Sequence, residues 1–140
     1  MLRQQSTILT VRAPDQGLHD ITSRVASWTA STGIKEGLLT LFCRHSSASL
    51  LIQENAAPAA RQDLEAYFEW IAPESTTAYA HNDEGPDDMP AHLRTALTQT
   101  SLSIPVNDGR LLLGTWQGIY LFEHRRHPHD RQVALHLIGD

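Results

Sequence analysis

The sequence predicts an α+β fold with a mainly antiparallel β-sandwich core flanked by about three helices. Several short runs alternate apolar and polar residues or are continuously apolar over strand length, and three segments carry apolar residues at helical spacing. Between two of the strand-like runs lies "NDG" at 107–109, a strong hairpin signal. The 140 residues fit one domain, 1–140, without an internal repeat or linker.

The first half of the chain predicts three strands and two helices. The expected strands cover 6–11, 37–43 and 48–54, and the expected helices cover 19–32 and 58–71. In the first helix, Ile21, Val25 and Trp28 recur at i, i+4 and i+7, and Gly33 is suited to end it. Pro58 suits the first turn of the second helix.

The second half of the chain predicts one long loop, one helix and four strands. Residues 72–87 contain turn-forming and acidic residues without apolar periodicity, which is typical of a functional loop. Asp88 is placed to cap a helix over 89–100. The expected strands cover 101–106, 110–116, 118–124 and 131–139.

Composition excludes several classes of protein. Eleven basic and 16 acidic side chains give a net charge of -5, so no strong basic field attracts nucleic acid. The single cysteine, Cys43, has no partner for an internal disulfide. No basic, apolar leader begins the chain, and no apolar run approaches the roughly 18 residues that span a bilayer. We therefore expect a soluble cytoplasmic protein without membrane or nucleic-acid partners.

Eight histidines are unevenly distributed, and His45 has the most suggestive neighbours. It ends a predicted strand and is followed by Ser46, Ser47 and Ser49. Such a segment can place an imidazole and several hydrogen-bond donors at the edge of one pocket. A strand-end histidine beside a serine-rich turn explains the same pattern without any function.

The segment "HNDEGPDDMPAH" places a histidine at each end of an acidic stretch, at His81 and His92. His92 lies in the first turn of the expected helix, where the positive end of the helix dipole favours neutral imidazole. Together with His45, these residues predict a three-histidine metal site with an open position. Three separate surface histidines are the alternative, because the sequence has no compact H-x-x-x-H signature.

Two further segments contain candidate site residues. "EHRRHPHDR" at 123–131 combines histidines with Arg125, Arg126 and Arg131, which favours an anion site over a metal site, although a solvated loop is also compatible. "GTWQG" at 114–118 places an aromatic ring and an amide between glycines, which suits a pocket wall or ordinary packing. Carboxylates that could act as acids or bases are Glu54, Asp63 and Glu123.

Three segments together resemble the YjbQ family, also called the secondary thiamine-phosphate synthase family. They are "RHSSASLLIQEN", "HNDEGPDDMPAH" and "IPVNDGRLLLGTWQGIYLFEH", and the similarity continues in order along nearly the whole chain. The resemblance implies a small α+β fold that assembles as a homotrimer, with sites near the subunit boundaries. Many members have a phenylalanine and "DGPR" after the glutamate that matches Glu123. This chain has "HRRHPHDR", so no family role is carried over to His124, Arg125 or Arg126.

The implied activity joins hydroxymethylpyrimidine diphosphate to thiazole phosphate with release of pyrophosphate, as a weak, secondary reaction. The alternatives are a different physiological substrate, or a metal- or phosphate-binding trimer without turnover. The resemblance places His45, His81 and His92 around a divalent metal ion, with zinc expected and nickel, copper or iron also compatible. The expected catalytic residues are Glu54, Asp88, Gln117 and Glu123. The residues expected to bind the phosphorylated substrate are Ser46, Ser47, Ser49, Trp116 and Arg131.

Overall fold

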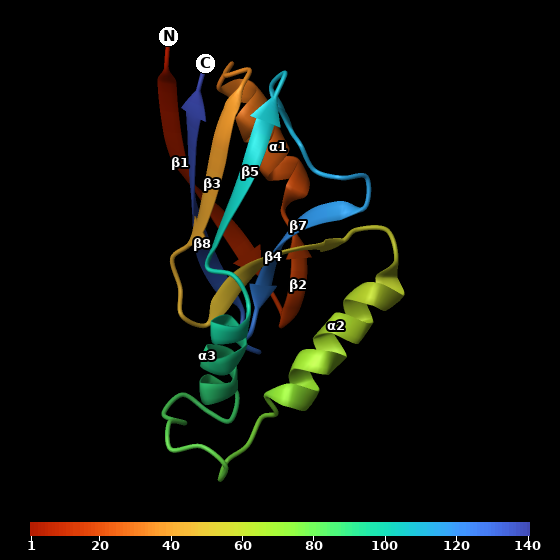
Figure 1. Cartoon of the computed structure of the whole chain (residues 1–140). Coiled ribbons are helices and arrows are strands. Elements are labelled where there is room, and N and C mark those ends of the chain that lie inside the picture. Colours follow the sequence, from red (N-terminus) through yellow and green to blue (C-terminus); the bar gives the residue numbers. More distant parts are fainter.

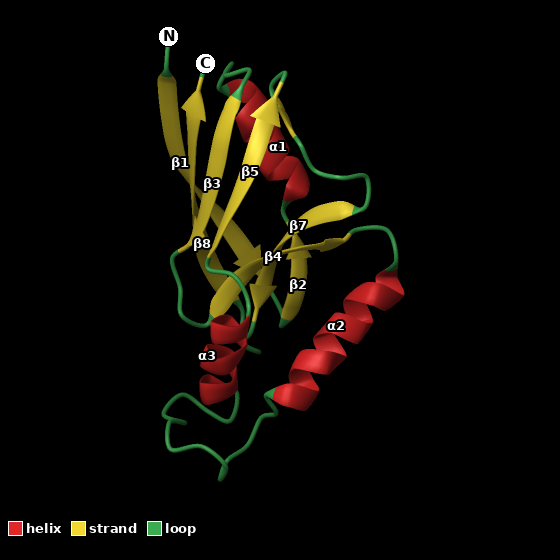
Figure 2. Ribbon diagram, in the orientation of Figure 1, coloured by secondary structure: helices red, strands yellow, loops and turns green.

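A computed structural model describes residues 1–140 and confirms the α+β class, with eight strands and three helices (Figures 1 and 2). The strands are β1 (Arg3–Ala13), β2 (Gly17–Asp20), β3 (Gly37–Cys43), β4 (Ala48–Glu54), β5 (Ser101–Asn107), β6 (Arg110–Leu111), β7 (Gln117–Glu123) and β8 (His129–Gly139). The helices are α1 (Thr22–Ser31), α2 (Pro58–Ile71) and α3 (Asp88–Leu97). No helix has the length and apolar character that a membrane-spanning segment requires.

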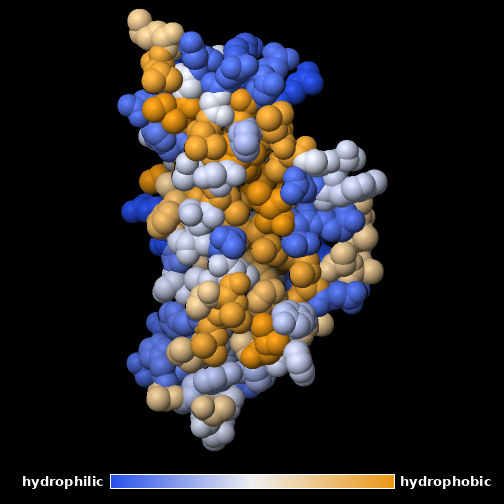
Figure 3. Space-filling model, in the orientation of Figure 1, coloured by the Kyte–Doolittle hydropathy of each residue, from blue (hydrophilic) through white to orange (hydrophobic).

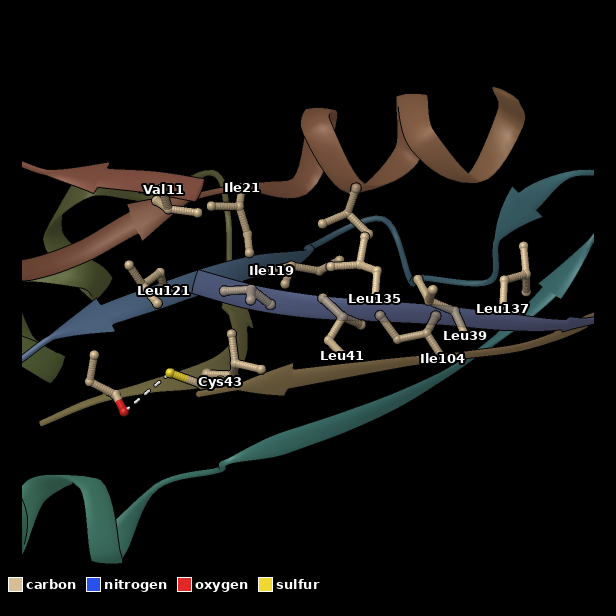
Figure 4. Close-up of a cluster of buried hydrophobic side chains, with 14 of the residues drawn as sticks. Val11, Ile21, Leu39, Leu41, Cys43, Ile104, Ile119, Leu121, Leu135 and Leu137 are labelled. Carbon is tan, nitrogen blue, oxygen red and sulfur yellow. Dashed lines mark hydrogen bonds between the residues drawn. The ribbon is translucent and has the colours of Figure 1, made fainter. Parts of the chain in front are cut away.

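The strands form two antiparallel sheets. One has the order β1-β8-β3-β5-β6 and the other has the order β2-β7-β4. Their inner faces and α1 enclose a core of 17 buried residues, to which β3 contributes Leu39, Leu41 and Cys43 at alternate positions (Figure 4). Such alternation is what a strand with one buried face requires.

Helix α2 covers the smaller sheet with a second apolar cluster. Phe68 packs edge-on against Phe122 with ring centroids 5.2 Å apart, and Leu18 and Tyr120 complete the buried group. This cluster holds α2 alongside β7. Buried charged residues, namely Asp87, Asp88, Glu123, Arg125 and Arg131, lie around the start of α3, the end of β7 and the start of β8.

The five-stranded sheet leaves apolar side chains on its outer face. Ile8, Leu38, Phe42 and Ile138 are each at least 40 % exposed. Register places Leu38 beside Ile138 and both Ile8 and Phe42 beside Ala134. The space-filling view shows hydrophobic surface running along the strands (Figure 3). The two sheets therefore bury one face of the larger sheet and leave the other without a cover.

Four of the differences between the predicted and the observed elements change the type, cap, end or length of an element. Residues 17–20, which were expected as turn and helix start, form β2, because they pair with β7. Asp87 rather than Asp88 holds the N-cap position of α3, and no side chain caps that helix. The helix ends at Leu97 because Thr98 is extended. The 107–109 hairpin is confirmed, but its second strand is only Arg110–Leu111.

Candidate metal centre

Four segments meet at the α3 end of the sandwich, shown at the bottom of Figure 1. They are the turn between β3 and β4, the end of β7, the start of β8, and the loop that leads into α3. Hydrogen bonds join them: His92 contacts the carbonyl of Ser46, and Arg131 contacts Ser47. Residues from distant parts of the sequence thus surround one small region.

His81, Asp88 and His92 form the tightest group of potential metal ligands. Their ligand atoms all lie within 4.8 Å of one another. Nε2 of His81 is 3.1 Å from Oδ2 of Asp88, and Nε2 of His92 is 3.3 Å from Oδ1. Ligand atoms around a tetrahedral zinc ion lie roughly 3.3 Å apart, so the spacing suits a small divalent ion.

The hydrogen-bond partner of His92 determines which of its ring nitrogens can bind a metal ion. Nδ1 of His92 lies 3.0 Å from the Ser46 carbonyl oxygen, which can only accept, so Nδ1 carries the hydrogen. In the neutral ring, Nε2 then presents a lone pair to the carboxylate oxygen of Asp88. Two acceptors at 3.3 Å repel unless a proton or a metal ion lies between them. A backbone carbonyl that fixes the other ring nitrogen is also the usual support of a ligating histidine.

Asp88 is held as a buried carboxylate, only 1 % exposed. Burial opposes its ionisation, but the Glu84 backbone N–H, at 3.1 Å from Oδ2, and the cationic groups around it outweigh burial. The pKa of Asp88 therefore lies below its ordinary value. The carboxylate is ionised at neutral pH and available to a cation.

Arg125 is a buried clamp that ties the loop before α3 to the end of β7. Its guanidinium donates to Oδ2 of Asp87 at 3.1 Å, and to the side chain and the carbonyl of Glu84, both at 2.9 Å. Its backbone N–H donates to Glu123. Desolvation opposes the charge of Arg125, but the bonds to Asp87 and Glu84 raise its pKa overall. The clamp thus fixes the segment that carries His81 and Asp88.

The arginines of the basic stretch 123–131 have acidic partners within the chain. Arg125 is occupied by Asp87 and Glu84, and Arg126 pairs with Glu74. Arg131 forms a two-pronged pair with Glu123, which is fully buried. A cluster of free guanidinium groups, which the sequence suggested, is therefore absent. Nη1 is the one nitrogen of the Arg131 guanidinium without a hydrogen-bond partner in the protein. This atom is not fully buried.

His45 is not brought into the group of His81, Asp88 and His92. Its Nε2 accepts the backbone N–H of Gln132 at 2.8 Å, so the neutral ring carries its hydrogen on Nδ1. Burial, supported by the Arg131 guanidinium, lowers the pKa of His45 and keeps this ring neutral. In this orientation neither nitrogen offers a free lone pair to a metal ion. The structure thus assembles two of the three histidines proposed from the sequence.

Of the three candidate serines, Ser49 lies inside the protein. It is fully buried, and its hydroxyl contacts Nε2 of His124 at 2.9 Å and the hydroxyl of Thr98. A substrate cannot reach it without displacing these groups. Ser46 is exposed and Ser47 is half-buried beside Arg131. The accessible hydroxyl groups are therefore those of the β3–β4 turn.

Glu54, Trp116 and Gln117 lie at the opposite end of β7 from Glu123. Glu54 pairs with Gln117 in the sheet, whereas Glu123 pairs with Ala48. Six residue steps along a strand span roughly 20 Å. Within one chain, these candidate residues therefore form a group separate from the histidines. Trp116 is 62 % exposed there.

Sequence reasoning named Asp88 as a helix cap and a catalytic carboxylate, and missed its contact with both histidines. The available signal was its i, i+4 spacing to His92 on a helix. Nothing in the local sequence indicated that Asp87 and Glu84 would bind Arg125, because 37 residues separate Asp87 from it in the chain. Such pairing depends on the fold.

Comparison with known proteins identifies the family of the chain. Residues 7–140 match the family model described as "UPF0047 protein YjbQ-like". A UPF0047 protein of Synechocystis is 49 % identical over 138 residues, covering 99 % of this chain and 94 % of that protein. The UPF0047 protein YjbQ of Escherichia coli O157:H7 is 41 % identical, covering 94 % of this chain and 96 % of its own length.

Solved structures agree with the sequence comparisons. An uncharacterised YjbQ/UPF0047-family protein of Clostridium acetobutylicum is 34 % identical, with a TM-score of 0.80 over 94 % of this chain and 97 % of that one. A conserved hypothetical protein of Thermus thermophilus is 33 % identical, with a TM-score of 0.82 over 92 % and 97 % of the two chains. The family match and these identities together show that the chain belongs to the YjbQ-like UPF0047 family.

Proposed function

We propose that this protein binds a divalent metal ion through His81, Asp88 and His92. The observation that carries the proposal is that two acceptor atoms, Nε2 of His92 and Oδ1 of Asp88, face each other. A cation between them would replace their repulsion with attraction to both. Two imidazoles and a carboxylate with a further position open are also the donor set of several catalytic zinc sites. Zinc is the expected ion.

We further propose that the centre acts on phosphorylated small molecules, with thiamine-phosphate synthesis as the reaction to test. A bound divalent ion would supply charge neutralisation for phosphate oxygens. Beside it, Ser46 and Nη1 of Arg131 can donate hydrogen bonds to an anionic group. Ser47 and Glu123 hold the Arg131 guanidinium in place. The family resemblance, rather than this geometry, supplies the pyrimidine and thiazole substrates.

One observation favours a binding protein without turnover as the alternative. Glu123, expected as a catalytic carboxylate, is fully buried and neutralised by Arg131. Glu54 and Gln117 are at the far end of β7 within the same chain. The chain alone therefore offers Asp88 as the only expected carboxylate beside the histidines, and that residue is proposed to hold the ion.

A homotrimer, as the resemblance implies, would resolve this separation. The uncovered apolar face formed by Ile8, Leu38, Phe42 and Ile138 gives copies of the chain a surface to bury. If copies meet along this face, Glu54, Trp116 and Gln117 of one chain can approach the histidines of another. We propose that the complete site is shared in this way.

Elemental analysis of untagged protein tests the metal proposal directly. We expect about one divalent ion per chain in the wild type, loss of that ion in His92→Ala, and retention in His136→Ala, whose ring contacts Gln4 on β1. His45→Ala should also retain it. Equal loss in the His92→Ala and His136→Ala variants would contradict the assignment.

A turnover assay separates the two functional alternatives. Protein stripped with a chelator is compared with reloaded protein in the synthesis of thiamine phosphate. We expect activity only after reloading. Unchanged activity without metal would separate binding from catalysis, and absence of turnover in both states would favour the binding protein.

A further inference from the structure

A second candidate site lies at the start of α2, away from the proposed metal centre. A pocket of about 130 Å³ is lined by Glu54, Asn55, Ala56, Ala57, Pro58, Arg61 and Tyr120. It is at the Glu54 end of the β4–β7 pair, whereas Ser47 and Glu123 mark the other end. The pocket is large enough for one small anionic group but not for a nucleotide.

Arg61 provides the charge in this pocket. Its guanidinium carbon lies 5.2 Å from the centre of the Tyr120 ring, and the side chain forms no hydrogen bond or ion pair with the protein. A half-buried guanidinium usually pairs with an anion or a carbonyl group. Here the aromatic face orients the group, and its five N–H donors remain free.

The other residues that line the pocket carry further polar groups, most of which are hydrogen-bonded. The hydroxyl of Tyr120 donates to the carbonyl of Glu54 at 3.1 Å, and the amide of Asn55 donates to the carbonyls of Thr115 and Gln117. One Glu54 oxygen accepts the Ala56 N–H, and the other has no protein donor. The pocket therefore combines free donors with one free acceptor.

This combination selects a particular kind of anion. We propose that the pocket binds inorganic phosphate in its hydrogen phosphate form, with Arg61 as the principal donor. A hydrogen phosphate can accept bonds from Arg61 and donate its own hydroxyl to the free oxygen of Glu54. A simple carboxylate such as acetate has no proton to offer Glu54, and its charge would be repelled. Within one chain this pocket lies outside the metal group, and phosphate binding here does not require a bound metal ion.

Titration of metal-free full-length protein with inorganic phosphate tests the proposal, with the backbone amide of Ala57 followed by NMR. We expect a saturable shift of this amide with phosphate and a much smaller one with acetate. Arg61→Gln should weaken phosphate binding by about tenfold or more, as expected for loss of a charged hydrogen-bond donor. Arg61→Lys should bind with intermediate affinity because the charge remains.

Arg110→Gln is the matched control, since Arg110 is exposed and also lacks a protein partner. It should bind phosphate like the wild type, and thermal unfolding should show that all three variants are folded. Equal weakening in the Arg61→Gln and Arg110→Gln variants would show general charge attraction and overturn the site. Equal binding of acetate and phosphate would overturn the phosphate assignment. Because metal is absent throughout, neither result bears on the metal centre.

Discussion

Replacement of Asp88 by asparagine removes one negative charge from the metal group and leaves the shape of the side chain nearly unchanged. Asp88 accepts the Glu84 N–H at 3.1 Å and faces His81 Nε2 and His92 Nε2 at 3.1 and 3.3 Å. As a proposed ligand, its loss should weaken metal binding by about 100-fold or more, since even supporting partners of ligands contribute 10- to 100-fold.

The same substitution should destabilise the metal-free fold. Loss of the charge-assisted bond from the Glu84 N–H and of the attraction to Arg125 costs about 1–3 kcal/mol, which we expect to exceed the gain from an amide that donates to Nε2 of His92; this lowers Tm by roughly 3–10 °C for a chain of this size. The pKa of Asp88 lies below its ordinary value, so its contribution is present above the unfolded pKa and is lost as pH falls through the folded pKa. The gap between wild type and variant should therefore begin to narrow below about pH 4 and narrow further as pH falls.

Asp83→Asn is the matched control. Asp83 belongs to the same loop and lies 3.9 Å from Nδ1 of His81, but its side chain is 80 % exposed. It should retain metal and change unfolding by less than about 0.5 kcal/mol. Calorimetry of metal binding and urea unfolding at about pH 3.5 and 7 measure both effects. The reasoning fails if the Asp88→Asn variant binds metal like the wild type, or if the Asp83→Asn variant loses as much.

Three further predictions follow from the buried groups and the uncovered sheet. Glu123→Gln should lower the free energy of unfolding by about 3–5 kcal/mol, measured by urea titration, because it leaves Arg131 buried without its partner. Asp130→Asn, in the exposed pair with Arg12, should lower it by less than about 1 kcal/mol in the same titration. Burial lowers the pKa of His124 to about 3, so between this value and its ordinary pKa the histidine is protonated in the unfolded chain and neutral in the folded chain. The free energy of unfolding should therefore fall as pH is lowered from about 6.5 to 3, by at most about 1.4 kcal/mol per pH unit. His124→Gln should reduce this slope. An unchanged slope would show that other groups cause the pH dependence. Phe42→Asp should yield a species near 15.6 kDa in sedimentation at low micromolar concentration, while the wild type sediments as a trimer; a monomeric wild type that holds metal would refute both the trimer and the shared site.

Local sequence patterns predicted most of the fold. The nearly continuous apolar run at 37–43 identified β3, and the i, i+4, i+7 spacing of Ile21, Val25 and Trp28 identified α1. The "NDG" turn formed as expected, with positive φ at Asp108 and Gly109. Residues 17–20 could not be identified as a strand from the sequence, because their conformation depends on pairing with β7, about 100 residues away.

The candidate site was less accessible to sequence reasoning. His81 and His92 were identified from the loop that separates them, and they do meet, with ring centroids 5.4 Å apart. The role of Asp88 between them, and the occupied lone pair of His45, depend on side-chain orientation. The neutralisation of Arg125 and Arg131 depends on acidic partners that the fold brings from elsewhere in the chain. Charge counts alone therefore could not indicate that these guanidinium groups have acidic partners within the chain.

The contact between His92 and Ser46 has a consequence for mutational scanning. The acceptor is the main-chain carbonyl of Ser46, so every side chain at that position can preserve the bond. Replacement of Ser46 by alanine removes its hydroxyl but leaves this bond intact, and other side chains could stand there without altering the orientation of the imidazole. Side-chain substitutions do not reveal a contact that is made by a main-chain carbonyl. They become detectable only when the peptide group itself is changed, for example by ester replacement of the amide that follows Ser46, which weakens its carbonyl as an acceptor.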